Sequence, residues 1–335
     1  MSPSEPPAAG CPHPRSAREE ALRGVLYAAA GYFLWGISVA FYKLFGGIGL
    51  DEMMAHRIVW SVVLMAVILV VSGRFAGLRW ALRSRRTVAT LLVTSSLIAI
   101  NWTVFLWAVA NGRVLEVSLG YYVNPLVSVL LGYVLLGERL TRPQTVAVGL
   151  AAVAVLIQGI GVGAWPWISL TLAVSFGFYG YFHKTVAIGA AEGLFVEVSI
   201  FAPFCLAYVV WLGASGTGAF LTGWWPAVLL VATGPWTAMP LLCFAAGARR
   251  LRLATLARIS HTWVGAGHRE CEKCGRGQLQ YLGPSIQFLL AIFAFGEPLR
   301  MAGLVSFVLL WLGLAVYTAD LIRQDRRWRS SGARP

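Results

Sequence analysis

The sequence predicts an all-α integral membrane protein with ten transmembrane helices arranged as two inverted five-helix repeats. The chain of 335 residues is 58% hydrophobic and only 12% charged, with a mean hydropathy of +0.70, whereas about a quarter of the residues of soluble domains are charged. The apolar residues gather in runs of about 20, the length at which a helix crosses the hydrocarbon layer. One of these runs occurs twice in related form, which indicates an internal duplication.

Ten apolar runs follow one another along the chain, and most of the connections between them are short. Because a backbone in lipid must satisfy its own hydrogen bonds, we expect each run to form a helix. The runs cover residues 24–45, 53–73, 88–110, 115–137, 143–162, 165–187, 193–213, 225–247, 280–296 and 302–321.

The internal repeat is clearest between residues 119–140 and residues 279–299. Each copy is an apolar, helix-length run with a proline near its start and a Gly-Glu pair at its end. The matched residues share an offset of 159 positions, and they are Pro125 with Pro284 and Gly137-Glu138 with Gly296-Glu297.

Weaker matches extend the repeat to the other spans. Trp35-Gly36 matches Tyr179-Gly180 at an offset of 144, and Arg57 matches Glu197 at an offset of 140. Each half therefore contains five spans, and because five is odd, the second half enters the membrane in the opposite orientation. We predict a first five-helix repeat over residues 23–163 and a second over residues 164–321.

The distribution of charge predicts the orientation. Residues 1–22 are predicted to form a disordered cytoplasmic tail and residues 322–335 a basic cytoplasmic tail. With the N-terminus inside, 23 of the 27 Lys and Arg residues fall on the cytoplasmic side and three on the other, as the positive-inside rule requires. The net charge of +13 therefore indicates contact with the lipid bilayer and does not indicate a nucleic-acid partner.

Residues 258–279 interrupt the symmetry between the halves. This polar, Gly-rich segment is an insertion that removes the start of the ninth span, and it is expected to be cytoplasmic. It contains four residues that bind metals in other proteins: His261, His268, Cys271 and Cys274. Although Cys-x2-Cys is a zinc spacing, the order and spacing of the histidines do not fit the usual zinc motifs. A metal site is therefore not favoured, and no cofactor is expected.

Four ionisable residues within the predicted spans are candidates for a site: His56, Arg57, Glu116 and Glu197. Charged groups at membrane depth are costly and tend to face a cavity or one another. Arg57 and Glu197 each lie one turn into their span. They either face a central cavity, where Glu197 would carry a coupling proton, or lie at the interface and extend to water. For Glu116, near the outer end of its span, the interfacial interpretation is favoured.

The two matched prolines mark the most informative polar positions. Asn124-Pro125 and Gly283-Pro284 lie in corresponding spans, and a proline removes a helix hydrogen bond and frees a carbonyl. Either these are structural kinks or they mark a substrate site where the repeats meet. Aromatic residues lie close to these prolines or on neighbouring spans, among them Trp35, Trp102, Tyr122 and Tyr281. Next to Trp102, Asn101 adds a polar amide within the span. The aromatic residues predict a cavity for a planar or amphipathic small molecule.

Motifs of catalysis and of nucleotide binding are absent from the sequence. It has no G-x-x-x-x-G-K-[ST] loop, no nucleophile elbow and no HExxH. We therefore expect a protein that is not an enzyme and whose transport uses an ion gradient or runs downhill. The alternative is a membrane-embedded enzyme or lipid-handling protein, for which only the 258–279 insertion offers a polar cluster.

Several motifs together resemble those of one transporter family. They are GYFLWGIS (31–38), DEMMAHRIVWS (51–61), NWTVFLWAV (101–109), EVSLGYYVNPL (116–126), LLGERL (135–140), SFGFYGY (175–181), PLLCFAAGARRLRLATL (240–256) and QYLGPS (280–285). In this order, over about residues 22–321, the chain resembles the RarD group of the EamA-type drug/metabolite transporter superfamily, described as chloramphenicol-sensitivity permeases. The chain departs from the group in the insertion, since QYLGPS would otherwise follow LATL almost directly.

The resemblance implies a multi-pass protein of the bacterial inner membrane that exports a small drug or metabolite by alternating access, with protons as the expected coupling ion. It implies a small-molecule partner and leaves the oligomeric state open, a homodimer included. The residues of this chain that match the group's motifs are Trp35, His56, Arg57, Asn101, Trp102, Glu116, Tyr122, Asn124, Pro125, Tyr281 and Pro284. Their individual roles are not assigned by the resemblance.

Overall fold

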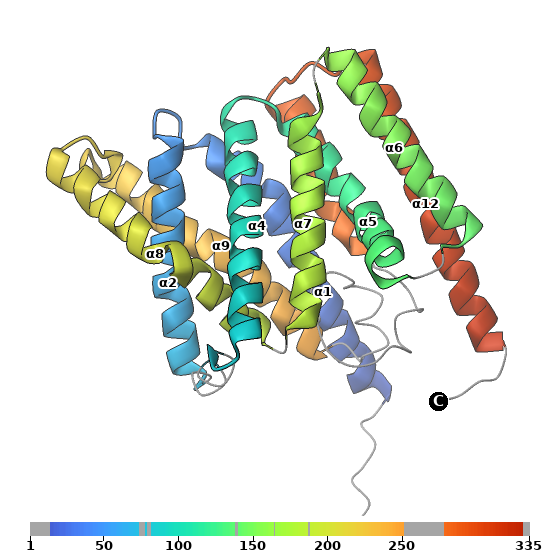
Figure 1. The fold of residues 1–335 in the computed structure, drawn as a ribbon, viewed down its shortest axis with the longest axis horizontal. Coiled ribbons are helices and arrows are strands. Elements are labelled where there is room, and N and C mark those ends of the chain that lie inside the picture. Colours follow the sequence, from blue (N-terminus) through green and yellow to red (C-terminus); the bar gives the residue numbers. More distant parts are fainter. Residues whose placement is uncertain are drawn as a thin grey trace, which may run out of the picture.

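In the parts of the chain that its computed structural model describes, the regular secondary structure is entirely helical, and these parts contain no strand (Figure 1). The described residues are 14–73, 78, 82–137, 140–163, 165–186, 188–250 and 278–330. This architecture confirms the all-helical class that the hydrophobic runs predict.

The helices follow the predicted runs along the chain. The first half contains α1 (Pro14–Lys43), α2 (Leu50–Val71), α4 (Arg85–Ala110), α5 (Val114–Leu136) and α6 (Arg142–Val162). The second half contains α7 (Trp167–Thr185), α8 (Ala190–Ser215), the short helix η1 (Ala219–Leu221), α9 (Trp224–Arg250), η3 (Gln278–Tyr281), α11 (Leu282–Leu289), the π-helical turn η4 (Leu290–Ala294) and α12 (Met301–Ser330).

Local sequence signals set several of the helix ends. At the start of α6 the Thr141 hydroxyl accepts a hydrogen bond from the Gln144 N–H, while the Gln144 side chain accepts one from the Thr141 N–H, which is a capping box. Ser84 caps α4 through the N–H of Thr87. Gly163 ends α6 with φ of 69°, in the left-handed region that favours glycine.

Among the described residues, eight helices are long and apolar enough to cross a membrane: α1 from Arg23 onward, α2, α4, α5, α6, α8, α9 and α12. They correspond to eight of the ten predicted spans. α7 is not among them, since its second half carries polar residues such as Tyr179, Tyr181 and His183. The apolar segment Leu282–Ala294 is also not among them, because it is shorter than a span.

The helix bounds differ from the prediction at both ends of the chain. α1 begins at Pro14, so residues 14–22, expected to be disordered, are helical. Their sequence, PRSAREEAL, is rich in the good helix formers Ala, Glu, Arg and Leu. α12 similarly continues to Ser330, beyond the predicted boundary at residue 322. Of the predicted insertion over residues 258–279, residues 258–277, which include the zinc cluster, lie outside the described residues, and residues 278 and 279 belong to η3.

Consecutive helices run in alternate directions through the bundle, and distant parts of the chain become neighbours (Figure 1). α6 packs along α12, α2 along α8 and α9, α1 beside α9, and α5 beside α7. Two glycines permit close approach of helices. A Cβ on Gly234 of α9 would lie 2.6 Å from the backbone of Trp60 in α2, and a Cβ on Gly120 of α5 would lie 2.9 Å from the carbonyl oxygen of Ser169 in α7.

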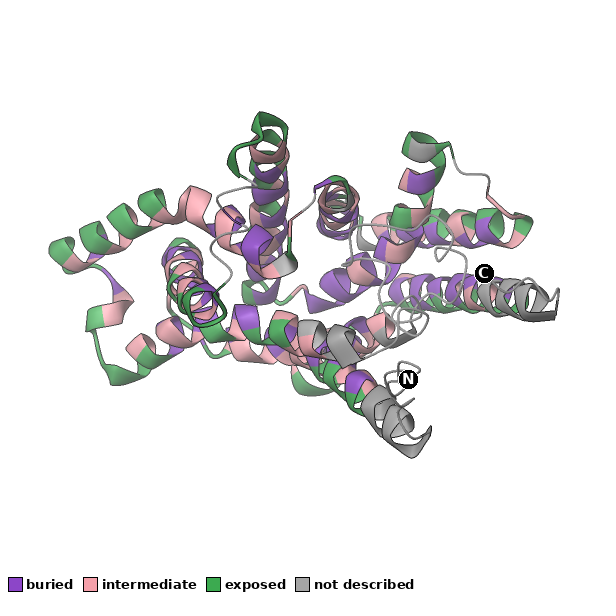
Figure 2. Ribbon diagram, turned by 90° about the horizontal axis from the view of Figure 1, so that it is seen from below, coloured by how far each residue is buried: buried purple, intermediate pink, exposed green. Residues whose placement is uncertain are grey.

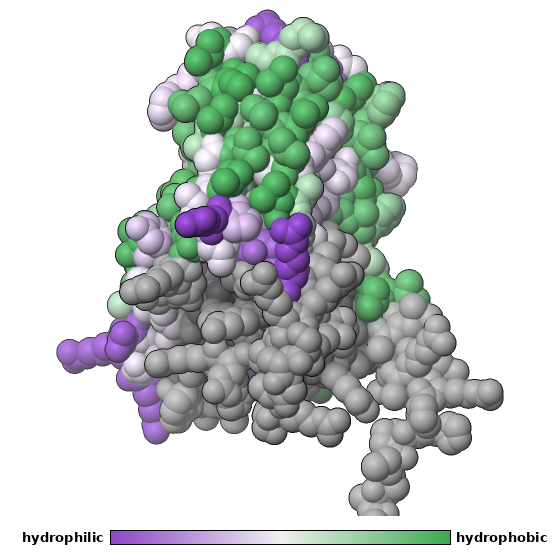
Figure 3. Space-filling view, turned by 90° about the vertical axis from the view of Figure 1, so that its right-hand side faces the viewer, coloured by the Kyte–Doolittle hydropathy of each residue, from purple (hydrophilic) through white to green (hydrophobic). Residues whose placement is uncertain are grey.

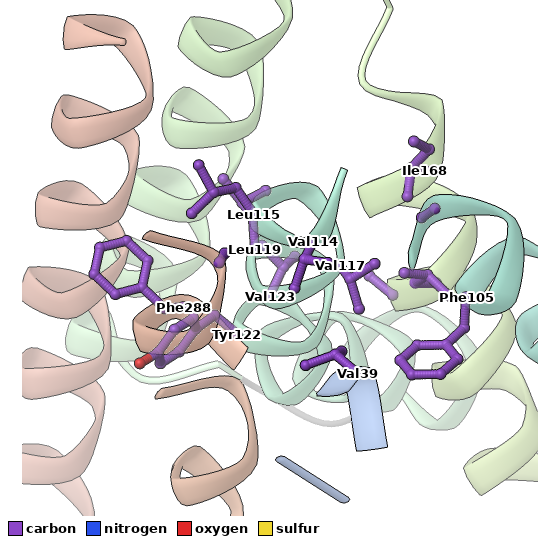
Figure 4. Close-up of a cluster of buried hydrophobic side chains, with 14 of the residues drawn as sticks. Val39, Phe105, Val114, Leu115, Val117, Leu119, Tyr122, Val123, Ile168 and Phe288 are labelled. Atoms are coloured by element: carbon purple, nitrogen blue, oxygen red, sulfur yellow. The ribbon is translucent and has the colours of Figure 1, made fainter. Parts of the chain in front are cut away.

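The interior of the bundle is organised around α5. In its apolar window 61% of the residues are buried, against 28% to 39% for the other candidate membrane helices, so α5 is the central helix. Its residues Leu119 and Tyr122 belong to a large hydrophobic cluster with Phe105 of α4, Ile168 of α7 and Phe288 of α11 (Figure 4). Seen along the bundle, buried residues lie mainly on the inward sides of the helices (Figure 2).

The outside of the bundle is apolar. Large hydrophobic side chains are exposed there, among them Ile160 of α6 and Trp311 and Leu312 of α12. Figure 3 shows a face that is hydrophobic over most of its described height, with hydrophilic side chains gathered toward its ends. Such a large exposed apolar surface is typical of contact with lipid, in agreement with the predicted membrane protein.

Candidate functional site

A cavity lies inside the bundle, between helices of both halves of the chain. Its empty space, including the open mouth, is about 1080 Å³. The walls combine aromatic and polar side chains, and they are formed by Tyr32, Trp35, Ser38, Tyr42, Arg57, Ile98, Asn101, Trp102, Phe105, Tyr121, Asn124, Pro125, Phe176, Tyr179, Leu194, Trp236, Thr237, Leu241, Gln280, Gly283, Pro284 and Gln287. Seven candidates from the sequence are among them: Trp35, Arg57, Asn101, Trp102, Asn124, Pro125 and Pro284.

Arg57 projects from α2 into this cavity. Its Nε donates a hydrogen bond to the Thr237 hydroxyl of α9 at 3.1 Å. The guanidinium carbon lies 4.1 Å from the centre of the Trp102 ring and 5.3 Å from that of the Tyr42 ring, so both aromatic faces stabilise the cation. Of the two predicted alternatives for Arg57, the structure has the one in which it faces a cavity.

Asn101 joins three helices at the cavity wall. Its amide nitrogen donates to the carbonyl of Leu172 at 3.1 Å and to the hydroxyl of Ser175 at 3.0 Å, both in α7. Its amide oxygen accepts from the Tyr121 hydroxyl of α5 at 3.2 Å. With donors and acceptor all engaged, this buried amide holds α4 and α5 against α7.

The two matched prolines occupy different places in their helices. Pro125 lies inside α5, next to Asn124. Pro284 lies in the first turn of α11, directly after η3, where a helix has no use for the missing N–H. The carbonyl of Pro284 accepts a hydrogen bond from the Ser118 hydroxyl of α5 at 2.8 Å. Both prolines line the cavity, but only Pro125 interrupts the hydrogen bonds of a helix interior.

Tyr122 and Tyr281 lie behind the cavity wall. Their rings stack with centres 6.3 Å apart, and the Tyr122 hydroxyl is 2.6 Å from the Ser285 hydroxyl of α11. Tyr122 also contacts Phe307 of α12 edge to face. These contacts join α5 to α11 and α12, which is a packing role in this conformation.

His56, although adjacent to Arg57, faces away from the cavity. Its ring stacks on Phe220 of η1 with centres 4.9 Å apart, and its Nδ1 accepts a hydrogen bond from the Trp60 indole at 3.2 Å. Its Nε2 lies 4.0 Å from a carboxylate oxygen of Glu52. Successive residues of a helix point about 100° apart, so the pair in the sequence divides between the cavity and the η1 side.

Glu116 lies at the beginning of α5, away from the cavity. It forms an ion pair with Arg113 at 2.6 Å and borders a separate polar pocket with Gln158, Glu297 and Arg300. Glu297 accepts hydrogen bonds from the N–H groups of Val114 and Leu115 at 2.7 and 2.9 Å and so caps α5. Burial raises the pKa of the Glu297 carboxyl, although these two N–H groups and the charge of Lys43 oppose that shift.

Glu197 of α8 is buried behind the cavity wall with a full set of partners. One carboxylate oxygen accepts from the Tyr179 hydroxyl at 3.0 Å, and the other lies 2.8 Å from His183 Nε2. The backbone carbonyl of Glu197 accepts from the Ser95 hydroxyl of α4 at 3.0 Å. Tyr179 separates this pair from the cavity that it lines.

Several residues of the cavity are not among the predicted site residues. Tyr42, Trp236, Thr237 and Gln287 all line it, and the Trp236 ring stacks on Phe41 at 4.3 Å. His183, which is also not among the predicted site residues, is the partner of Glu197. His183 follows Tyr179 by four residues, which places both side chains on one face of α7. This spacing is the feature of the sequence from which the pairing of His183 with Tyr179 could have been predicted.

The cavity has the chemistry of a binding site. It offers aromatic faces and amide groups together with a cation, and its described walls hold no second charged side chain. Within the described residues, no three His, Cys, Asp or Glu side chains gather as metal ligands would. The arrangement can therefore enclose a small planar molecule and orient it through a few polar contacts.

Comparison with known proteins finds relatives that match most of the chain. Residues 22–159 match the EamA-like transporter family. An "Uncharacterized transporter" of Vibrio cholerae is 37% identical over 90% of this chain and 94% of its own length. The "Protein RarD" of Escherichia coli K12 is 38% identical over 92% of this chain and 98% of its own length. A solved structure titled "Crystal structure of protein", 16% identical, aligns with a TM-score of 0.52 over 92% of this chain and 98% of that one, and shows the fold alone.

Proposed function

Because the chain belongs to the RarD group of EamA-like transporters, we propose that it is a secondary transporter that exports a small drug or metabolite across the bacterial inner membrane by alternating access. Membership of this family and the apolar helices make it a multi-pass bacterial membrane transporter. The observation that carries the finer proposal is the aromatic cavity, which is built by helices from both halves of the chain and contains a buried arginine.

The proposed topology is ten spans in two inverted five-helix repeats, over residues 23–163 and 164–321, with both termini in the cytoplasm. Three observations support it. In Figure 1, α1 and α7, which begin the two halves, run in opposite directions. The contacts are paired as a two-fold axis would pair them, because α1 packs on α9 as α7 packs on α4. The start of α1 and the end of α12 also lie at the same end of the bundle.

The proposed ten spans include α7 and the segment Leu282–Ala294, neither of which is both long and apolar enough to cross a membrane by itself. α7 packs on α4 and α5, and its Tyr179 and His183 side chains contact Glu197 of α8, so these two polar groups have partners within the protein. The segment from η3 to η4, residues 278–294, packs on α1 and α5 and spans by virtue of that protein environment. Irregular or polar helices at membrane depth are tolerated where protein surrounds them.

Proton coupling is proposed to run through Glu197. Its carboxylate is fully buried beside a titratable imidazole, His183, which is itself partly exposed. Binding or release of a proton by such a pair changes its net charge and makes or breaks its ion pair. Because Tyr179 links Glu197 to the cavity wall, the protonation state would influence the shape of the site.

Flux measurements with the purified, full-length protein in proteoliposomes test the proposed function. The compounds are chloramphenicol, to which the resemblance points, and a panel of neutral, cationic and anionic aromatic molecules. We expect saturable flux of at least one compound, accelerated by a pH gradient. A growth-inhibition panel with the gene deleted and overexpressed reports the substrate class in cells. Absence of protein-dependent flux for the whole panel would contradict the transporter function. Flux that is insensitive to the pH gradient would contradict proton coupling.

A further inference from the structure

Five buried polar atoms on the cavity wall have no hydrogen-bond partner among the described residues. They are Tyr42 Oη, Arg57 Nη1, Asn124 Oδ1, Trp236 Nε1 and Gln287 Oε1. Buried polar groups are nearly always satisfied, and a charged group left without a partner is the costliest case. That so many fall on one cavity indicates that a bound molecule completes them.

The unpartnered atoms divide into donors and acceptors by helix. Arg57 Nη1 and the Trp236 indole N–H are donors from the packed pair α2 and α9, and the Tyr42 hydroxyl of α1 also offers a proton. The acceptors, Asn124 Oδ1 and Gln287 Oε1, come from the packed pair α5 and α11. A ligand that completes the set presents acceptor atoms to α2 and α9 and an N–H or O–H group to α5 and α11.

The charge at the donor end is not balanced by the walls. Arg57 is the one charged side chain among the described residues that line the cavity. Thr237 occupies its Nε, and Trp102 and Tyr42 lie against the guanidinium group. Of its other two nitrogens, Nη1 is buried and has no hydrogen-bond partner among the described residues. A carboxylate is the natural complement of a guanidinium group in such a setting, because the hydrogen bond is charge-assisted.

We propose that this cavity is specific for small aromatic anions, whose carboxylate binds Arg57 with the Trp236 N–H and whose N–H or O–H group binds the amides of Asn124 and Gln287. The inference rests on the proposed function, since it names the substrate class of the same site. The aromatic body of the ligand lies among the rings of the wall, where it gains stacking contacts.

Equilibrium binding to the purified full-length protein in nanodiscs, measured by calorimetry, tests this specificity. The probes are indole-3-propionate, which carries a carboxylate and a ring N–H, its neutral amide, and its N-methylated acid. We expect the acid to bind at least about tenfold more tightly than the amide, because the charge-assisted hydrogen bond is lost. N-methylation is expected to weaken binding about threefold to tenfold, because one neutral hydrogen bond disappears.

Variants at Arg57 identify the residue that reads the charge. Arg57→Gln is expected to reduce the preference for the acid to within about twofold, and Arg57→Lys to retain part of it. Arg300→Gln, a change at an exposed arginine outside the cavity, is the matched control and keeps the full preference. Thermal unfolding of each variant confirms that the fold is intact.

Equal binding of acid and amide, no binding of the acid at millimolar concentration, or a preference that survives Arg57→Gln would overturn the inference. These outcomes differ from a failure of the proposed function. Binding that depends on Arg57, without flux, would support the anion site and contradict the transporter function. Flux of neutral compounds that is independent of Arg57 would support the transporter function and contradict the anion specificity.

Discussion

α2 and α8 start in the same way but place opposite charges in the interior. Each follows a glycine and carries a glutamate in its first turn, and five residues later α2 has Arg57 where α8 has Glu197. Both side chains are buried. Arg57 lines the cavity with one nitrogen unpartnered among the described residues, whereas both carboxylate oxygens of Glu197 have partners.

Equivalent positions in the two proposed repeats therefore do not give two charged side chains the same role. The role of each depends on the groups that it contacts. A buried charge without a counter-charge is costly and binds an ion of opposite sign when one is available. A buried carboxylate whose two oxygens already have hydrogen-bond partners does not need a ligand to satisfy them. Under the proposed function, α2 would recognise the substrate and α8 would couple transport to protons, and four changes to the chain test this division of roles.

Reversing the charge on α2 has the largest expected effect. Arg57→Glu places a carboxylate where an anion is expected to bind, and like charges in a desolvated site repel strongly. We expect the initial rate of uptake of indole-3-propionate into proteoliposomes to fall by about 100-fold or more. Arg57→Lys, which keeps the charge, is the control and should retain a measurable rate. Uptake at more than half the wild-type rate in Arg57→Glu would show that no anion contacts this position.

Disturbing the support of α2 comes next. Gly234→Ala places a Cβ 2.6 Å from the backbone of Trp60, which cannot rotate away. Overpacking of this kind lowers the free energy of unfolding by about 1–3 kcal/mol. Gly149→Ala is the matched control, because nothing lies within 4 Å of the added Cβ. Thermal unfolding in one detergent compares the two, and equal melting temperatures would contradict the close contact of α2 with α9.

Neutralising the charge on α8 should affect coupling without affecting recognition. Glu197→Gln keeps a side chain of the same shape beside Tyr179 and His183 but cannot release a proton. We expect the stimulation of uptake by a pH gradient to fall about tenfold, within the usual range for loss of a proton-transferring group. Calorimetric binding of indole-3-propionate should stay within about twofold. A weakening of binding with coupling retained would reverse the roles given to α2 and α8.

The smallest expected effect comes from the partner of Arg57 on α9. Thr237→Val removes the hydroxyl that accepts from Arg57 Nε while keeping the volume of the side chain. Loss of one such hydrogen bond costs about 1 kcal/mol, so we expect affinity for the probe to fall about fivefold. Thr233→Val is the control one turn away, since the Thr233 hydroxyl donates to the carbonyl of Leu230 in its own helix. Equal affinities of the two variants for the probe would show that Thr237 does not support binding through Arg57.

The sequence predicts the helical membrane fold well, because runs of apolar residues determine it through the length of the bilayer. It also selects Arg57, Asn101 and Trp102, since polar and aromatic residues within such runs are unusual. It does not show that Trp102 lies against Arg57, because that contact depends on how α2 and α4 pack.

Rotation about the helix axis accounts for much of the rest. His56 and Arg57 are neighbours in the sequence and face different sides of α2. Trp236 and Gln287 lie in apolar surroundings that resemble ordinary packing positions, so their unpartnered atoms become visible only with the cavity. Glu116 shows the same limit, because its ion pair with Arg113 depends on the turn that begins α5.

The most direct test of the account is concentration-dependent uptake of indole-3-propionate by proteoliposomes that contain the wild type, Arg57→Gln or Arg300→Gln. We predict saturable uptake by the wild type and by Arg300→Gln, and an uptake rate lower by about tenfold or more in Arg57→Gln. Saturable uptake of equal rate in all three proteins would contradict the assignment of the cavity and its arginine as the substrate site.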